Sequence, residues 1–139
     1  MSSMNADYLL DQGSTFVLEF KMYDEDLQSV SLLNNQTPLY SFRMKLRKTK
    51  YRGVSLFGLT EAATFVVPSG TTPDFTSNGF YLVEGNTGFV RFVITSDTTA
   101  SFKPGMYFYD IEAVQSLTGG NVVSKVLSGK FDIDAESTR

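Results

Sequence analysis

The sequence predicts an all-β fold, an antiparallel β-sandwich of roughly seven strands with one short helical turn. Apolar and polar side chains alternate with period two in nearly every ordered segment, and a helical 3.6-residue stripe is hard to find. The composition, with 12 Phe, seven Tyr and no Trp, is that of a sheet protein. A chain of 139 residues without a repeat or a linker fits one domain, so we expect a single β-sandwich domain over residues 1–139.

Two segments of the first half show the alternation most clearly. Ser14–Met22 places four apolar side chains on one face: Phe16, Leu18, Phe20 and Met22. Leu39–Thr49 does the same with Tyr40, Phe42, Met44 and Leu46. Both patterns predict half-buried antiparallel strands with one face toward a core and one toward water.

Five further strands are expected along the rest of the chain: Ala62–Val67, Phe80–Glu84, Gly88–Thr95, Met106–Gln115 and Val122–Asp134. In Met106–Gln115 the charged Asp110 and Glu112 must face away from the core. The predicted inward set is therefore Tyr107, Tyr109, Ile111 and Ala113.

Turn chemistry separates these strands. Gly119 and Gly120 predict a hairpin between the last two strands, since glycine adopts positive φ without strain. Ser96 or Asp97 is a candidate N-cap for a single helical turn that ends at Phe102. Two segments, Asp24–Thr37 and Val67–Asn78, have the composition of long loops.

Composition excludes several classes of function. The chain has no Cys and no His, which removes disulfides, thiolate metal sites and the usual catalytic triads. A net charge of −3 argues against bulk nucleic-acid binding. No apolar run approaches the roughly 20 residues of a membrane helix, and the N-terminus lacks the pattern of a secretory signal. We expect a protein made in a cytoplasm, without a cofactor, a membrane or a nucleic acid as partner.

One stretch is strongly basic. It holds half of the 12 cationic side chains of the protein: Arg43, Lys45, Arg47, Lys48, Lys50 and Arg52. One interpretation is an electrostatic contact with an acidic neighbour or a polyanion. The other is a solvated strand face whose charges also protect an edge from unwanted pairing. The residues allow both, and both can hold in a protein that assembles.

The acidic residues do not predict a site. Asp24, Glu25 and Asp26 lack the glycine-bearing spacing of a calcium loop, so we expect no metal. Asp110 and Glu112 are two residues apart on an exposed strand, which gives neither the cleft nor the dry pocket of a glycosidase. We therefore expect no catalytic residue and no enzyme.

Tyr107 and Tyr109 are interpreted as scaffold residues. A tyrosine near the start of a late strand often buries its ring and returns its hydroxyl to the backbone. An aromatic platform for nucleic acid is the alternative, but such a platform needs a basic groove and this strand carries two acids.

Three pieces of the chain, Asp7–Phe20, Phe42–Lys50 and Thr95–Arg139, resemble a family of small immunoglobulin-like β-sandwich domains from bacteriophage virions. They contain the sequences QGSTF, FRMKLRK, KPGMYFYDIEA and VLSGKFDIDAESTR, in this order. The resemblance implies an immunoglobulin-like sandwich in a virion, with other virion structural proteins as partners and several copies in a symmetric assembly. The segments Asp24–Pro38 and Val67–Asn78 are longer than in such domains.

Three functions follow as alternatives. The first is a structural protein of the phage tail or baseplate region. The second is a capsid-decorating (cement) protein. The third is a carbohydrate-binding module that would use exposed aromatic side chains such as Phe75, Phe80 and Tyr81.

Overall fold

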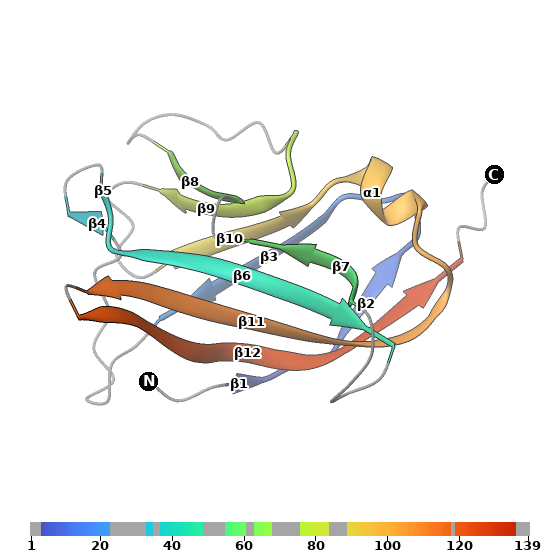
Figure 1. Cartoon of the computed structure of the whole chain (residues 1–139). Helices are drawn as coiled ribbons and strands as arrows, with labels where there is room; N and C mark the ends of the chain where they lie inside the picture. Colours follow the sequence, from blue (N-terminus) through green and yellow to red (C-terminus); the bar gives the residue numbers. More distant parts are fainter. Residues whose placement is uncertain are drawn as a thin grey trace.

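The computed structural model describes residues 4–22, 33–34, 37–48, 55–60, 63–67, 76–83, 89–117 and 119–135. Within these ranges the chain forms two open sheets that pack as a sandwich, with one short helix (Figure 1). The predicted all-β class and the sandwich architecture are confirmed. No helix in the described part of the chain is long and apolar enough to cross a membrane.

We call the sheet that contains the last two strands the large sheet. Its order is β1 (Met4–Asn5), β12 (Gly120–Asp134), β11 (Gly105–Leu117), β6 (Tyr40–Arg47) and β7 (Ser55–Leu59). β2 (Tyr8–Asp11) continues β1 along the same edge of β12, and both pair with β12 in parallel. The first and the last strands of the chain therefore lie side by side.

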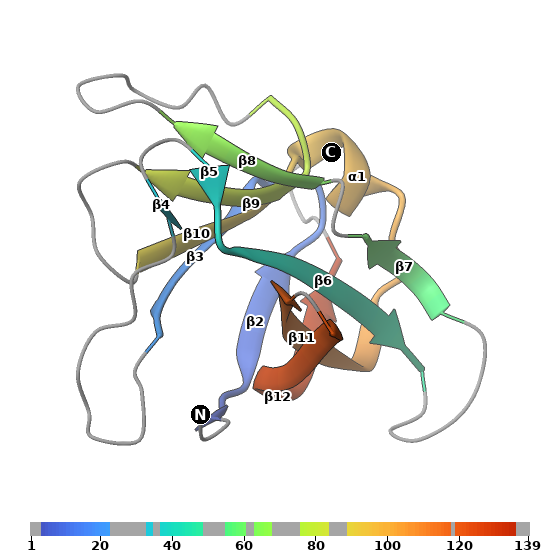
Figure 2. The ribbon, with the colours of Figure 1, turned by 60° about the vertical axis from the view of Figure 1, so that its left-hand side comes forward.

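The other sheet, the small sheet, has the order β3 (Phe16–Lys21), β10 (Phe89–Ile94), β9 (Gly79–Val83) and β8 (Thr64–Val67). β4 (Leu33–Asn34) and β5 (Thr37–Pro38) pair only with each other among the described residues. Figure 2 shows the two layers, with β3 and β10 on one side and β2, β11 and β12 on the other.

The seven predicted strands correspond to β3, β6 and β8 to β12. The prediction missed β1, β2, β4, β5 and β7. It was also wrong in making every pairing antiparallel, because β1 and β2 pair with β12, and β8 with β9, in parallel. Alternation identifies which face of a strand is buried, but it does not identify the neighbour of that strand.

The faces were predicted correctly. Tyr107, Tyr109, Ile111 and Ala113 of β11 are all buried, as are the inward residues Phe42, Met44 and Leu46 of β6. Aromatic rings meet between the sheets. The ring centroids of Phe16 in β3 and Phe131 in β12 are 5.1 Å apart, and those of Phe42 in β6 and Phe80 in β9 are 5.5 Å apart.

The predicted hairpin at Gly119 and Gly120 is confirmed, since Leu117 of β11 pairs with Gly120 of β12. β12 carries one irregularity: its register with β11 shifts between Ile111 and Glu112. The shift is a β-bulge that opposes Ile111 to Leu127 and Glu112 to Lys125.

The short helix α1 (Ser96–Ala100) lies at the predicted place, but its predicted N-cap was wrong. The N-cap is Thr95, which has an extended backbone and makes no side-chain cap hydrogen bond. Ser96 and Asp97 are already helical. The amide of Thr95 instead donates to Oδ1 of Asn78 at 2.7 Å, so a residue distant in sequence fixes where the helix begins.

Thr99 of α1 ties together the corner where the chain passes between the two sheets. It is the buried polar residue of the described core, with 0% of its surface exposed. Its Oγ1 accepts from the amide of Gly13 at 3.1 Å and donates to the carbonyl of Ser14 at 2.7 Å. Gln12 adds a bond from its side-chain amide to the carbonyl of Phe102 at 2.8 Å. The turn between β2 and β3 is thereby fastened to the helix.

Candidate functional site

Four of the six predicted basic residues lie within the described part of the chain. Arg43, Lys45 and Arg47 alternate along β6 with the buried Phe42, Met44 and Leu46, so they face outward from the large sheet. Lys48 follows the end of the strand. The other two, Lys50 and Arg52, lie outside the described residues.

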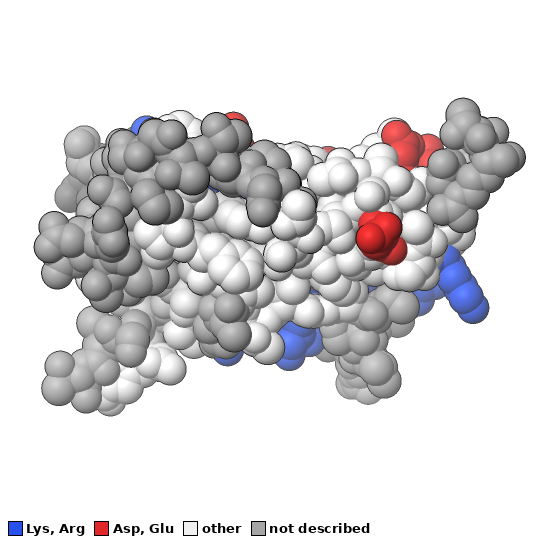
Figure 3. Space-filling model, turned by 90° about the horizontal axis from the view of Figure 1, so that it is seen from above, with Lys and Arg blue, Asp and Glu red and all other residues white. Residues whose placement is uncertain are grey.

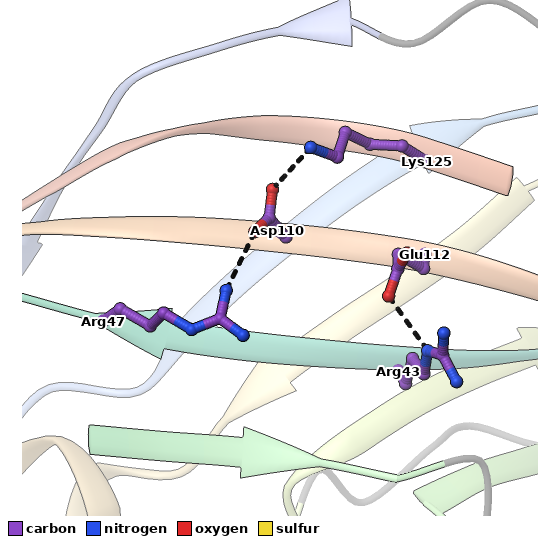
Figure 4. Close-up of polar contacts among 5 residues, drawn as sticks. All are labelled: Arg43, Arg47, Asp110, Glu112 and Lys125. Atoms are coloured by element: carbon purple, nitrogen blue, oxygen red, sulfur yellow. Dashed lines mark hydrogen bonds and ion pairs between the residues drawn. The ribbon is translucent and has the colours of Figure 1, made fainter. Parts of the chain in front are cut away.

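The two arginines of β6 are paired within the sheet (Figure 4). Nε of Arg43 lies 2.9 Å from Oε1 of Glu112, and Nη1 of Arg47 lies 3.4 Å from Oδ2 of Asp110. Nζ of Lys125 approaches the same Asp110 carboxylate at 3.2 Å from β12. The pairing of β6 with β11 and of β11 with β12 brings these charges together from three strands.

These ion pairs are only partly shielded from water. The exposed fractions of Asp110 and Glu112 are 25% and 31%, so neither carboxylate is in a dry pocket. Each carboxylate has its own cationic partner. Partly exposed pairs of this kind contribute about 0–1 kcal/mol each, and cross-strand charge pairs favour one register over another.

Lys45 is different from its neighbours on β6. Its side chain is exposed, and it makes no ion pair with any residue that the structure describes. Together with Arg43, Arg47 and Lys125 it borders a shallow groove of about 180 Å³, whose acids are Asp110 and Glu112. Four cations thus meet two carboxylates, and the surface around Lys45 keeps a positive excess.

Lys48 also has a partner. Its ammonium group lies over the ring of Tyr107, 4.7 Å from the centroid. A cation over an aromatic face is attracted by the electron density of the ring. Among the described basic residues of this stretch, Lys45 is therefore the one with neither an ion pair nor a ring contact to a described residue.

A second groove of about 360 Å³ adjoins the first and shares Asp110 and Lys125 with it. It runs beside the break between β1 and β2, where Oδ1 of Asp7 accepts from the amide of Lys130 at 2.9 Å. Gly129 is required here because a Cβ would lie 2.0 Å from the carbonyl oxygen of Ala6. The Asp7 carboxylate at this groove helps to hold β2 on β12, so its role is structural.

The two tyrosines of β11 behave as predicted. The hydroxyl of Tyr107 donates to the carbonyl of Lys103, and that of Tyr109 donates to the carbonyl of Ala6, each at 2.7 Å. Burial, and next the charge of Tyr8, raises the pKa of Tyr109 above its ordinary value of 10.0. Burial also raises the pKa of Tyr8. Both tyrosine hydroxyls of β11 donate to backbone carbonyls, so their role is structural.

Two of the three predicted sugar-binding aromatics, Phe80 and Tyr81, are not exposed. Phe80 is fully buried between the sheets, and Tyr81 is 6% exposed with its hydroxyl donated to the carbonyl of Ser77 at 2.8 Å. The expectation of exposure was wrong for both, because β9 has a strand on each side and is covered on each face. Phe75 lies outside the described residues.

No group of three or more acidic side chains that could hold a metal ion occurs in the described ranges. The acidic cluster Asp24, Glu25 and Asp26 falls outside them. No protein-family model matches the chain, and no curated protein matches it.

Proposed function

We propose that this chain is a non-enzymatic structural protein of a bacteriophage particle, placed in the tail or baseplate region in several symmetric copies. The observation that supports it most is the outer face of the large sheet. There, ion pairs link β6, β11 and β12, and the exposed Lys45 of β6 has no ion partner among the described residues. A surface with a positive excess fits an acidic neighbour.

The finer fold assignment in this proposal is an immunoglobulin-like sandwich. The order β7, β6, β11, β12 in one sheet and β3, β10, β9 in the other resembles the two sheets of variable-type domains. Tyr107 supports the assignment as well. It lies near the start of the strand after α1, and its hydroxyl returns to the backbone four residues upstream at Lys103, as in a tyrosine corner. The parallel β8 departs from that pattern.

The ion pairs indicate how such a contact would work. Arg43 and Arg47 are held by Glu112 and Asp110, so ordering them at an interface costs little side-chain entropy. Lys45 lies between them on the same strand face and attracts an acidic partner at long range. The exposed charge of Lys45 sets the rate of association with the partner and the salt dependence of that rate. The ion pairs hold the side chains of Arg43 and Arg47 in place on the surface.

The location is tested on particles. Phage particles that encode the chain are purified by density gradient, probed by mass spectrometry, and labelled with antibody for electron microscopy. We expect the chain in the particles at many copies, with the label at the tail end. Label distributed over the head would indicate the capsid-decorating alternative. Absence of the chain from purified particles would refute the proposal.

The contact surface is tested with one substitution, Lys45→Glu. Reversing Arg43 or Arg47 would also break an ion pair, whereas Lys45 has no such partner among the described residues. The matched control is Lys103→Glu, an exposed lysine with the same change in net charge. We expect Lys45→Glu alone to lose incorporation into particles, and wild-type attachment to weaken as salt rises. Equal incorporation of both variants would assign Lys45 to solubility.

A further inference from the structure

Charged side chains are unevenly distributed over the described surface. Seen from above, the sandwich shows only a few of them (Figure 3). The outer face of the large sheet instead carries the ion pairs that join β6, β11 and β12 (Figure 4). Two grooves adjoin there, and the larger one, of about 360 Å³, is not lined by Lys45. The contact proposed for Lys45 therefore leaves this larger groove without a role.

Three neighbouring strands, β11, β12 and β1, form the larger groove. Phe108 alternates with the buried tyrosines of β11, so it belongs to the outer face of the large sheet, where it lines the groove. The register places Lys130 of β12 opposite Phe108, and Ser128 opposite Asp110. On the other side of β12, Asn5 of β1 is the partner of Ser128. The strand pairing thus gathers one aromatic ring and several polar side chains from distant parts of the sequence.

Three polar side chains of this groove have hydrogen-bonding groups that the protein itself does not use. Asn5, Ser128 and Lys130 make no side-chain hydrogen bond or ion pair with any residue that the structure describes. The amide of Asn5 and the hydroxyl of Ser128 each donate and accept, and the ammonium group of Lys130 donates. Such groups are hydrated in the free protein, and a ligand rich in hydroxyls replaces that water with bonds of the same type.

The charges around the groove balance. Its cations are Lys125 and Lys130, and its carboxylates are Asp7 and Asp110. Oδ1 of Asp7 accepts from the amide of Lys130, and Asp110 pairs with two cations. A carboxylate accepts about four hydrogen bonds, so both acids keep the capacity to accept from a ligand. An anion would meet two carboxylates here, whereas a neutral ligand meets no opposing charge.

We propose that this groove binds a neutral sugar unit. The hydroxyls of a sugar donate and accept hydrogen bonds, as Asn5 and Ser128 do, and the apolar C–H face of its ring packs against an aromatic side chain such as Phe108. Phe108 is half-buried and has no aromatic or cation–π contact with a described residue, so part of its ring is available to a ligand. It supplies the aromatic surface that the buried Phe80 and Tyr81 cannot supply.

The size of the groove limits the ligand. A volume of about 360 Å³ is at the lower end of the range of about 300–1,000 Å³ for ligand sites, which indicates one or two sugar rings. A small polar ligand binds with modest affinity, so a dissociation constant on the order of 1–10 mM is expected. The inference goes beyond the proposed function, because it gives the chain a small-molecule ligand and does not depend on the place of the chain in a particle.

The first test is an NMR titration of the purified, isotope-labelled chain. The probes are glucose, galactose and mannose, and the disaccharides maltose, cellobiose and lactose, each up to about 100 mM. We expect at least one sugar to shift the amide signals of Phe108, Ser128 and Lys130 in a saturable way. Because the ligand is neutral, its affinity should not fall as salt rises. Glucuronic acid, which is glucose with a carboxylate, should bind more weakly. No saturable shift with any neutral sugar, or tighter binding of glucuronic acid, would overturn the proposal.

The second test locates the site with the neutral sugar that binds most tightly. Ser128→Ala should weaken binding about 2–10-fold, through the loss of one hydrogen bond. Ser41→Ala is the matched control, since Ser41 is a half-buried serine on the outer face of the same sheet and does not line the groove. Phe108→Leu keeps an apolar side chain but removes the flat ring, so it should weaken binding about tenfold. Phe89→Leu, at an exposed phenylalanine of the small sheet, should bind as wild type does.

The NMR spectrum of each variant shows directly whether it is folded. Folded Ser128→Ala and Phe108→Leu variants that bind the sugar as tightly as wild type would refute the assignment of the groove. Both tests use the purified chain, so their failure would leave the particle location open. Absence of the chain from particles would in turn leave sugar binding intact.

Discussion

The buried interior that holds Thr99 and Tyr109 and the charged outer face of the large sheet use polar groups in opposite ways. In the interior, each of these two hydroxyls bonds to a backbone group from a distant part of the chain, at 2.7 Å from Thr99 to Ser14 and from Tyr109 to Ala6. On the outer face, side chain meets side chain in partly exposed ion pairs.

The buried hydroxyls thus contribute to the fold, whereas the ion pairs determine the charge on the surface of the large sheet. Removing a buried hydroxyl leaves its backbone carbonyl or amide without that hydrogen bond in a partly buried position. An exposed carboxylate that loses its partner is solvated by water at little cost. The interior should therefore be sensitive to the loss of a single hydroxyl, and the outer face should tolerate the loss of whole side chains.

The largest effect is expected for Tyr109→Ala. The ring is 2% exposed and contacts Phe131 and Tyr8, so its removal leaves a large cavity and costs about 3–5 kcal/mol in the free energy of unfolding. Denaturant unfolding measures the loss. Tyr109→Phe separates the hydroxyl from the ring and should cost about 0.5–1.5 kcal/mol, for the bond to Ala6 alone.

An intermediate effect is expected for Thr99→Val, which keeps the shape and removes the hydroxyl. The amide of Gly13 and the carbonyl of Ser14 would both lose a buried partner, so we expect a loss of about 1–3 kcal/mol. Thr15→Val is the matched control, since Thr15 is exposed in the same turn and should change stability by less than about 0.5 kcal/mol. Equal melting temperatures for the two variants would contradict the role given to Thr99.

The smallest effect is expected for Asp110→Ala, one residue from Tyr109 and on the opposite face. Two partly exposed ion pairs disappear, and we expect a loss of under about 1 kcal/mol that diminishes further in high salt. Thermal unfolding at low and high ionic strength checks this. A cost near that of Tyr109→Ala would show that the outer face holds the fold together and would end the distinction between the two regions.

The sequence was sufficient for what depends on local pattern. Alternation predicted the buried faces of β3, β6 and β11, and the glycine pair predicted the last hairpin. It was insufficient where a neighbour distant in sequence decides. Asn78 fixes the start of α1, and β12 provides the partner for β1 and β2. Neither contact leaves a periodic signal in the segment concerned.

The candidate site was also predicted in part. Alternation placed Arg43, Lys45 and Arg47 outside the core, and all three lie on the outer face of β6. The register between β6 and β11, which composition does not encode, places Arg43 opposite Glu112 and Lys45 opposite Asp110. The Asp110 carboxylate nevertheless pairs with Arg47 and Lys125, and this choice of partner is not predictable from the alternation. Phe80 and Tyr81 were misjudged because aromatic residues after a polar loop look exposed until the next strands cover them.

The parallel contact of β2 with β12 has a consequence for how this protein folds. Tyr8 pairs with Phe131, so β2 remains without its partner until the last strand has been synthesised. Proteins whose contacts join residues far apart in the sequence fold slowly, on the scale of milliseconds to seconds for β-sandwiches. Until then, Tyr8 and Leu10 are apolar side chains on an unpaired strand, which is the condition under which nascent chains aggregate.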